Sequence, residues 1–191
     1  MSEPSPASPG AFRSTLHGAV GFAAVSVAAF SVWAFAGKKF PNEGTMYAAV
    51  AAVFVALSGI VLHPLVAGPR RLLRFTAAFV PAFLAYAAAW CAAWFPLRDR
   101  TGEWLGSAGG SVAFALVAGA MLRNLRAVPR VALLLFACHS AGYFAGGEVH
   151  AWATPHSATA AMLGWGLAYG FGFGAGIGIA FARLQQPGRK A

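Results

Sequence analysis

The chain has 191 residues, of which 59% are hydrophobic and only 10% are charged. Soluble domains carry charge on about a quarter of their residues, so this composition excludes an ordinary soluble fold. A net charge of +9 would favour nucleic-acid binding in a soluble protein. Here the basic residues stand in short links between long apolar blocks, where they are typical of topology signals beside lipid headgroups. Nucleic acid is therefore not an expected partner.

Residues 1–14 are rich in Pro, Ser and Ala, and we predict a disordered cytoplasmic tail. Apolar blocks of about twenty residues follow, the length that a helix needs to cross a bilayer. The predicted spans are residues 15–36, 46–66, 75–95, 104–122, 131–147 and 158–181. The first block is too long for the apolar region of a signal peptide, so we expect a retained helix. The chain is thus predicted to be all-α, with a six-helix transmembrane domain over residues 15–182 and a basic cytoplasmic tail over residues 183–191.

An even number of spans places both termini on one side of the membrane. That side holds most of the fourteen basic residues and, of the five acidic residues, only Glu3. Its links between spans contain Arg70, Arg71, Arg74, Arg123, Arg126 and Arg130. By the positive-inside rule both termini are cytoplasmic, in a plasma membrane of the bacterial inner-membrane type. Pro81, inside the third span, is expected to kink that helix or to free a carbonyl.

The sixth span carries a dense ladder of glycines. Lipid provides no hydrophobic drive for helices to associate, and small residues allow the close backbone approach that such interfaces use. One set at i, i+4 spacing, typical of a glycine zipper, is Gly166, Gly170, Gly174 and Gly178; a second, Gly172 and Gly176, lies on nearly the opposite face of a helix. This pattern predicts either a central helix or one that pairs inside the chain on one face and with a second copy on the other.

His139 lies near the middle of the fifth span, where an ionisable side chain is costly and usually has a partner. If that helix extends far enough, His139, Tyr143 and His150 share one face and form a polar seam leading into the bundle. The alternative is a neutral histidine hydrogen-bonded to a neighbouring helix. Both interpretations stay open from the sequence.

A second hypothesis concerns the polar link that follows, where Glu148, His150 and His156 could form a metal site facing outward. Imidazole and carboxylate suit zinc, copper or iron, but the spacing matches no known metal motif. The alternative is an interfacial loop anchored by Trp152. His139 could also supply one axial ligand to a haem, although His63 and His17 lie at a different depth. The sequence identifies no cofactor.

Three function classes remain. The absence of Asp, Glu, Lys or Arg within the predicted spans favours a non-catalytic sensor, regulator or assembly partner, acting through helix packing and a basic cytoplasmic face on a second copy or on a membrane or cytosolic protein. A channel or carrier for a small neutral or weakly polar solute is the second class. The third is a metal- or haem-dependent membrane enzyme using His139, Glu148, His150 and His156. Asp99 and Glu103 fall in a wet link without a protected pocket, so an enzyme is the less favoured class.

Overall fold

The computed structural model describes residues 10–186, which form α-helices joined by short links and 3-10 turns. Six of these helices are long and apolar enough to cross a membrane. They are α1 (Ala11–Ala36), α2 (Glu43–Leu62), α3 (Arg71–Leu97), α4 (Arg100–Met121), α5 (Val128–Ala153) and α6 (Ala158–Leu184). The short 3-10 helices are η1 (Gly37–Lys39), η2 (His63–Leu65) and η3 (Leu125–Ala127). The predicted all-helical fold with six helices of membrane-spanning length is confirmed for the described residues.

The largest departure from the predicted boundaries is the length of α5. This helix continues to Ala153, so Glu148 and His150 lie on its last turns and not in a link. The predicted span ends at residue 147, next to Gly146, where an added Cβ would collide with the Trp165 ring of α6. The glycine is there to admit that ring, and tertiary packing explains the residue without a helix end.

Smaller differences occur at other helix ends. α1 begins at Ala11, so residues 11–14 are helical, while residues 1–9 of the predicted tail and residues 187–191 lie outside the described range. α3 runs without interruption through Pro81 and includes Pro96 in its last turn. It ends at Arg98, which adopts the left-handed conformation with φ 48°. A left-handed C-terminal residue is a common way to end a helix, although glycine usually takes the position.

Side-chain caps start the three helices that begin at one end of the bundle. The carboxylate of Asp99 accepts a hydrogen bond of 2.8 Å from the Gly102 N–H at the start of α4. Asn42 and Ser157 accept equivalent bonds at the starts of α2 and α6. Such caps satisfy backbone N–H groups that have no partner within the helix.

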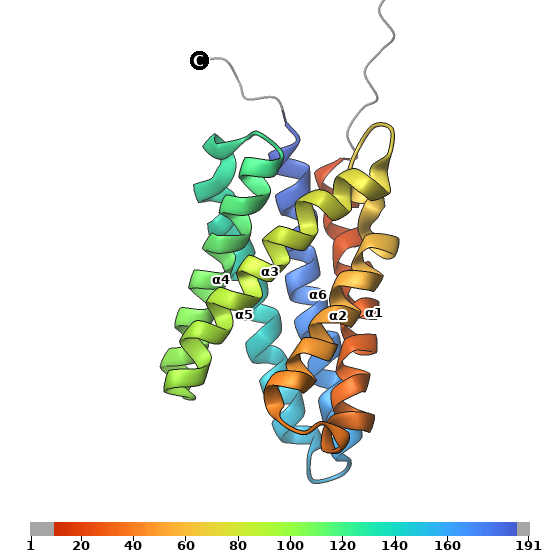
Figure 1. The fold of residues 1–191 in the computed structure, drawn as a ribbon, viewed down its shortest axis with the longest axis vertical. Helices are drawn as coiled ribbons and strands as arrows, with labels where there is room; N and C mark the ends of the chain where they lie inside the picture. Colours follow the sequence, from red (N-terminus) through yellow and green to blue (C-terminus); the bar gives the residue numbers. More distant parts are fainter. Residues whose placement is uncertain (1–9, 187–191) are drawn as a thin grey trace, which may run out of the picture.

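α6 lies between α1 and α5 (Figure 1). Added Cβ atoms at four of its glycines would collide with α1, and at two others with α5. The first four are Gly166, Gly170, Gly174 and Gly178, which face Phe30, Ser26, Gly18 and Ser14; the other two are Gly172 and Gly176, which face Gly142 and Leu135. We call this double contact the glycine seam. It brings three helices together backbone against backbone.

The remaining helices complete a ring in the order α2, α1, α6, α5, α4, α3. Fully buried phenylalanines fill its centre, with Phe22 on α1 and Phe173 on α6 meeting edge to face at 5.5 Å between ring centroids. The ring is weakest where α3 returns to α2. Figure 1 shows α3 crossing the bundle obliquely, so that it lies near α2 at one end and diverges from it toward the other.

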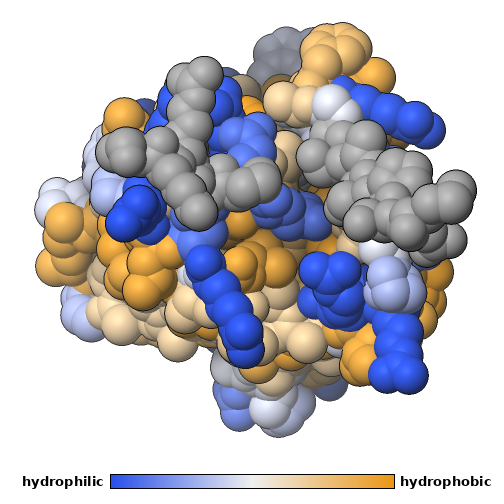
Figure 2. All heavy atoms as spheres, turned by 90° about the horizontal axis from the view of Figure 1, so that it is seen from above, coloured by the Kyte–Doolittle hydropathy of each residue, from blue (hydrophilic) through white to orange (hydrophobic). Residues whose placement is uncertain are grey.

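The two described ends of the chain lie at the same end of the bundle (Figure 1). The links between α2 and α3 and between α4 and α5 lie there too, and we call it the basic end. Its exposed arginines include Arg70, Arg71, Arg74, Arg123, Arg126 and Arg130. Figure 2 looks onto this end and shows hydrophilic groups spread over it, with hydrophobic surface between and around them. This distribution suits a headgroup region bordering an apolar belt.

Candidate functional site

A cavity of about 630 Å³ lies between α2 and α3, with side chains from α1, α4, α5 and α6 behind it. Tyr47 of α2 and Leu84 of α3 line this cavity and are 36% and 49% exposed on the outside of the bundle. The cavity therefore opens sideways, toward the lipid that would surround the helices. Its volume lies within the range of pockets that hold small organic ligands.

The cavity exists because side-chain size changes along the α2–α3 boundary. Near the basic end the two helices approach closely, and a Cβ at Gly59 would lie 3.2 Å from Thr76 Oγ1. Farther along, rings stand between the helices, with Phe54 and Phe83 at 5.4 Å between centroids. Because rings and not backbones make this contact, the helices stay apart.

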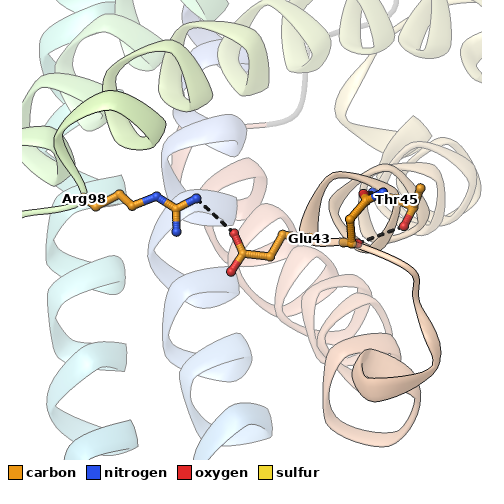
Figure 3. A network of polar contacts seen from close by, with 4 residues as sticks. Glu43, Thr45 and Arg98 are labelled. Carbon is orange, nitrogen blue, oxygen red and sulfur yellow. Dashed lines mark hydrogen bonds and ion pairs between the residues drawn. The ribbon is translucent and has the colours of Figure 1, made fainter.

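An ion pair crosses the cavity at the end opposite the basic end. Arg98, just after α3, donates to Glu43 Oε2 at 3.2 Å, at the start of α2 (Figure 3). The two side chains are 55% and 61% exposed. An ion pair this exposed is worth little free energy, so it is a weak link between the two helices.

Behind the cavity, His139 of α5 is fully buried and bonded to α3. The Tyr86 hydroxyl and His139 Nε2 share a hydrogen bond of 2.6 Å, and the Tyr169 hydroxyl of α6 lies 3.4 Å from the Tyr86 hydroxyl. Tyr86 and Tyr169 line the cavity, whereas His139 lies behind them. His139 Nδ1 has no hydrogen-bond partner among the described residues. The histidine thus fits the interpretation of a residue hydrogen-bonded to another helix, and its partner Tyr86 lines the cavity.

A second polar group enters the cavity from α4. The Tyr143 hydroxyl donates to Glu103 Oε1 at 3.2 Å, and Glu103 Oε2 lies 3.7 Å from Arg100 Nη1. Both Tyr143 and Glu103 line the cavity, and the glutamate side chain is only 19% exposed. The sequence interpretation placed Glu103 in a wet link. It missed this position because α4 begins at Arg100, one turn earlier than predicted, and turns the carboxylate inward.

Tryptophan and tyrosine rings form a continuous row along the inner wall of the cavity. The Tyr143 ring centroid lies 6.0 Å from that of Trp90 and 5.6 Å from that of Trp165. Trp90 in turn stacks on Trp94 at 5.6 Å, and Trp165 lies 6.0 Å from Trp33. All of these rings line the cavity. They give it flat, polarizable walls beside the Glu103 carboxylate.

The residues of the predicted metal site are not brought together. The His150 ring stacks on Trp33 and also lies against Trp165, whereas His156 lies against Trp152. Glu148 is exposed. Within residues 10–186 there is no group of three or more His, Cys, Asp or Glu side chains that could hold a metal ion. Of the predicted polar seam, His139 and Tyr143 stack at 5.8 Å, and His150 lies beyond them among the tryptophans.

Comparison with known proteins finds no matching family model, no matching curated protein and no matching solved structure. A fold does not by itself imply a function, so the assignment depends on the site. The signals that could have located it in the sequence are the aromatic residues at helical spacing in the third span, Tyr86, Trp90 and Trp94. Aromatic residues at this spacing are also common in helix cores, so the spacing alone does not indicate a site.

Proposed function

We propose that this chain is a membrane-embedded binding protein for a lipophilic small molecule, held in the cavity between α2 and α3. The observation that carries the proposal is the aromatic cavity of about 630 Å³ that opens on the side of the bundle. A ligand dissolved in lipid could enter it without crossing water. A mostly apolar wall with few polar groups is the usual composition of a small-molecule site.

The polar groups are placed at two depths. The Tyr86 and Tyr169 hydroxyls lie at the back of the cavity, and Glu103 with Tyr143 lies nearer the end that Arg98 and Glu43 close. Few polar groups at fixed positions orient a ligand whose remaining surface contacts rings. The hydrogen bonds that hold these groups preorganise them before a ligand binds.

Among the function classes, the arrangement best supports a sensor. The glycine seam immobilises α1, α5 and α6, so a ligand that changes the cavity would act mainly on α2 and α3. These two helices meet through η2 at the basic end, where a change could reach a membrane or cytosolic partner protein, or a second copy. A carrier remains the alternative, and it requires a second opening of the cavity. The metal- or haem-dependent enzyme has less support, because His139 is bonded to Tyr86 and His150 is packed among tryptophans.

We further propose that the basic end faces the cytoplasm of a bacterial-type cell, following the positive-inside rule. Cysteine labelling tests this orientation. With Cys91 and Cys138 replaced by serine, a membrane-impermeant maleimide applied to intact cells should label Thr154→Cys and should not label Gln186→Cys. The reverse pattern would invert the topology.

Binding is tested with the neutral probe N-phenyl-1-naphthylamine and the protein in lipid nanodiscs. Energy transfer from the cavity tryptophans to the probe should saturate with probe concentration, above the linear background of empty nanodiscs. Ala87→Phe, which fills the cavity, should weaken the saturable signal about tenfold or more. Ala141→Phe, on the exposed face of α5, is the matched control and should leave it unchanged. A signal unaffected by Ala87→Phe contradicts the proposal.

A loaded probe also separates sensor from carrier. A carrier would release the probe across the bilayer of sealed proteoliposomes faster than protein-free vesicles do. A sensor would bind it without accelerating its passage.

A further inference from the structure

We infer that the ligand of this cavity is a lipophilic organic cation, an ammonium or phosphonium ion carrying apolar or aromatic groups. The inference rests on the proposed function and adds the charge of the ligand. It follows from which charged side chains line the cavity and which do not.

The cavity has charge of one sign only on its described walls. Glu43 and Glu103 line it, and no Lys, Arg or His side chain does. The arginines that pair with these carboxylates, Arg98 and Arg100, stay outside. Arg98 lies over the Phe95 ring at 5.5 Å and Arg100 over the Phe144 ring at 4.2 Å, and neither ring lines the cavity. The Glu103 carboxylate is largely shielded from water, Glu43 is more exposed at the end of the cavity, and both arginines lie outside the lining.

A ligand cation could replace an arginine as the partner of either carboxylate. Arg98 and Arg100 have side chains 55% and 65% exposed, so water already hydrates them and their pairs are weakly held. A cation inside the cavity would interact with Glu103 away from bulk water, where the same charge separation gives a stronger attraction. A ligand cation can therefore compete with an arginine that water solvates.

The aromatic walls of the cavity also favour a positively charged ligand. Trp90, Tyr143 and Trp165 stand in a row beside Glu103, with ring centroids 5.6–6.0 Å apart. The faces of indole and phenol rings carry negative electrostatic potential, and cages of such rings bind quaternary ammonium groups. The cavity lining thus combines a carboxylate with a row of aromatic rings and contains no Lys, Arg or His side chain. This lining favours a cation with apolar substituents over an anion.

The test compares three molecules that share phenyl groups and differ in charge. Tetraphenylphosphonium, neutral triphenylphosphine oxide and tetraphenylborate each compete with N-phenyl-1-naphthylamine for wild-type protein in nanodiscs, with empty nanodiscs as the partition control. The phosphonium should displace the probe at a concentration about tenfold or more below that of the neutral compound, and the borate should be weakest.

Glu103→Gln should remove about tenfold of the phosphonium affinity and leave the affinity for the neutral compound unchanged. Glu148→Gln removes an exposed acid at the same end of the bundle, outside the cavity, and should change neither. Unchanged binding of N-phenyl-1-naphthylamine shows that the Glu103→Gln variant still folds. If that variant does not fold, Glu43→Gln is measured instead. We expect a smaller loss of phosphonium affinity from it, because the Glu43 side chain is more exposed.

Equal displacement by all three compounds, or strongest displacement by the borate, overturns the cation inference and leaves the binding proposal standing. The binding proposal itself is overturned if none of the three compounds displaces the probe and Ala87→Phe does not weaken probe binding. A short-chain phosphatidylcholine is tested in parallel. Displacement by it that depends on Glu103 supports the cation chemistry and identifies a lipid headgroup as its source.

Discussion

The two sides of this bundle differ in the size of the side chains at their helix contacts. On one side the glycine seam brings α1, α6 and α5 together through backbone atoms, so that a Cβ at Gly174 would collide with the Gly18 carbonyl oxygen. On the other side α2 and α3 meet through rings such as Phe54 and Phe83, and a cavity of about 630 Å³ remains between them. Both sides consist of apolar helices of similar length.

The comparison shows that hydrophobicity does not decide where this bundle is tight. Lipid chains are as apolar as the side chains they would replace, so association depends on how many atoms come into contact. Glycines allow long stretches of backbone to touch, and each contact adds a little dispersion energy. Large rings hold α2 and α3 apart and leave a space that a ligand can fill. The tight side stabilises the bundle, and the open side carries the proposed binding site.

The largest effect is expected from breaking the tight side. Gly174→Leu places a side chain where Gly18 and Phe22 already stand, and should destabilise the fold by about 3 kcal/mol or more. Gly109→Leu on α4, where an added Cβ meets nothing within 4 Å, is the matched control and should change stability little. Reversible unfolding in sodium dodecyl sulfate, followed by circular dichroism, measures both. Equal stability of the two variants would contradict the role of the seam.

The next effect concerns the hydroxyl that joins the two sides. Tyr86→Phe removes the bond between α3 and α5 and leaves His139 Nε2 without its partner, so we expect a loss of about 1–2 kcal/mol. Tyr169→Phe removes only a 3.4 Å contact and should cost less. The same unfolding measurement ranks the two. A greater loss of stability from Tyr169→Phe than from Tyr86→Phe would contradict the importance of the bond between Tyr86 and His139.

A third, smaller effect is expected at the basic end. The Gln185 amide donates to the carbonyl oxygens of Leu65 and Phe181, each at 2.8 Å, and accepts from the Ala67 N–H at 3.0 Å. It ties the end of α6 to the link between α2 and α3, and Gln185→Ala should cost about 1 kcal/mol. Hydrogen exchange of the Ala67 amide should accelerate in the variant. Unaltered exchange would contradict this connection between the two sides.

The smallest effect on stability is expected at the open side. Arg98→Gln breaks the exposed pair with Glu43 and should change the free energy of unfolding by less than about 1 kcal/mol. It should nevertheless speed the entry of N-phenyl-1-naphthylamine, because the link across the cavity is gone. Stopped-flow energy transfer measures that rate. A large loss of stability without faster entry of the probe would show that the Arg98–Glu43 pair stabilises the fold and does not restrict access to the cavity.

How much of this could be predicted from the sequence differs between the two sides. The six helices follow from the length of the apolar blocks, and the direction of each glycine set follows from helical spacing alone, because both signals lie within one helix. The cavity depends on which rings from six helices converge, and no local pattern encodes that. The bond between Tyr86 and His139 joins residues of α3 and α5, which are not adjacent in the ring, and only the assembled bundle brings the two side chains together.

The positions of Glu103 and His150 show a second limit. Both residues lie near helix ends, where a boundary error of one turn moves a side chain from water into the bundle or from a link onto a helix face. Glu103 became a cavity residue because Asp99 caps α4 one turn early. His150 lies on a helix and not in a link because α5 continues past Gly146, where the missing side chain admits the Trp165 ring.

The glycine seam also has a consequence for the order of events during synthesis. It joins α1 to α6, the first and the last of the six helices, so α1 leaves the ribosome long before the helix against which its glycine must close. Until then α1 can make only its contacts with the earlier helices, such as Phe22 against Phe79 and Phe83 of α3, and lacks its most extensive contact. Trp165 and Tyr169, which form part of the cavity wall, arrive on that last helix. Translation therefore delivers the α2 and α3 walls of the cavity before its back wall, and the cavity is complete only when α6 has been inserted.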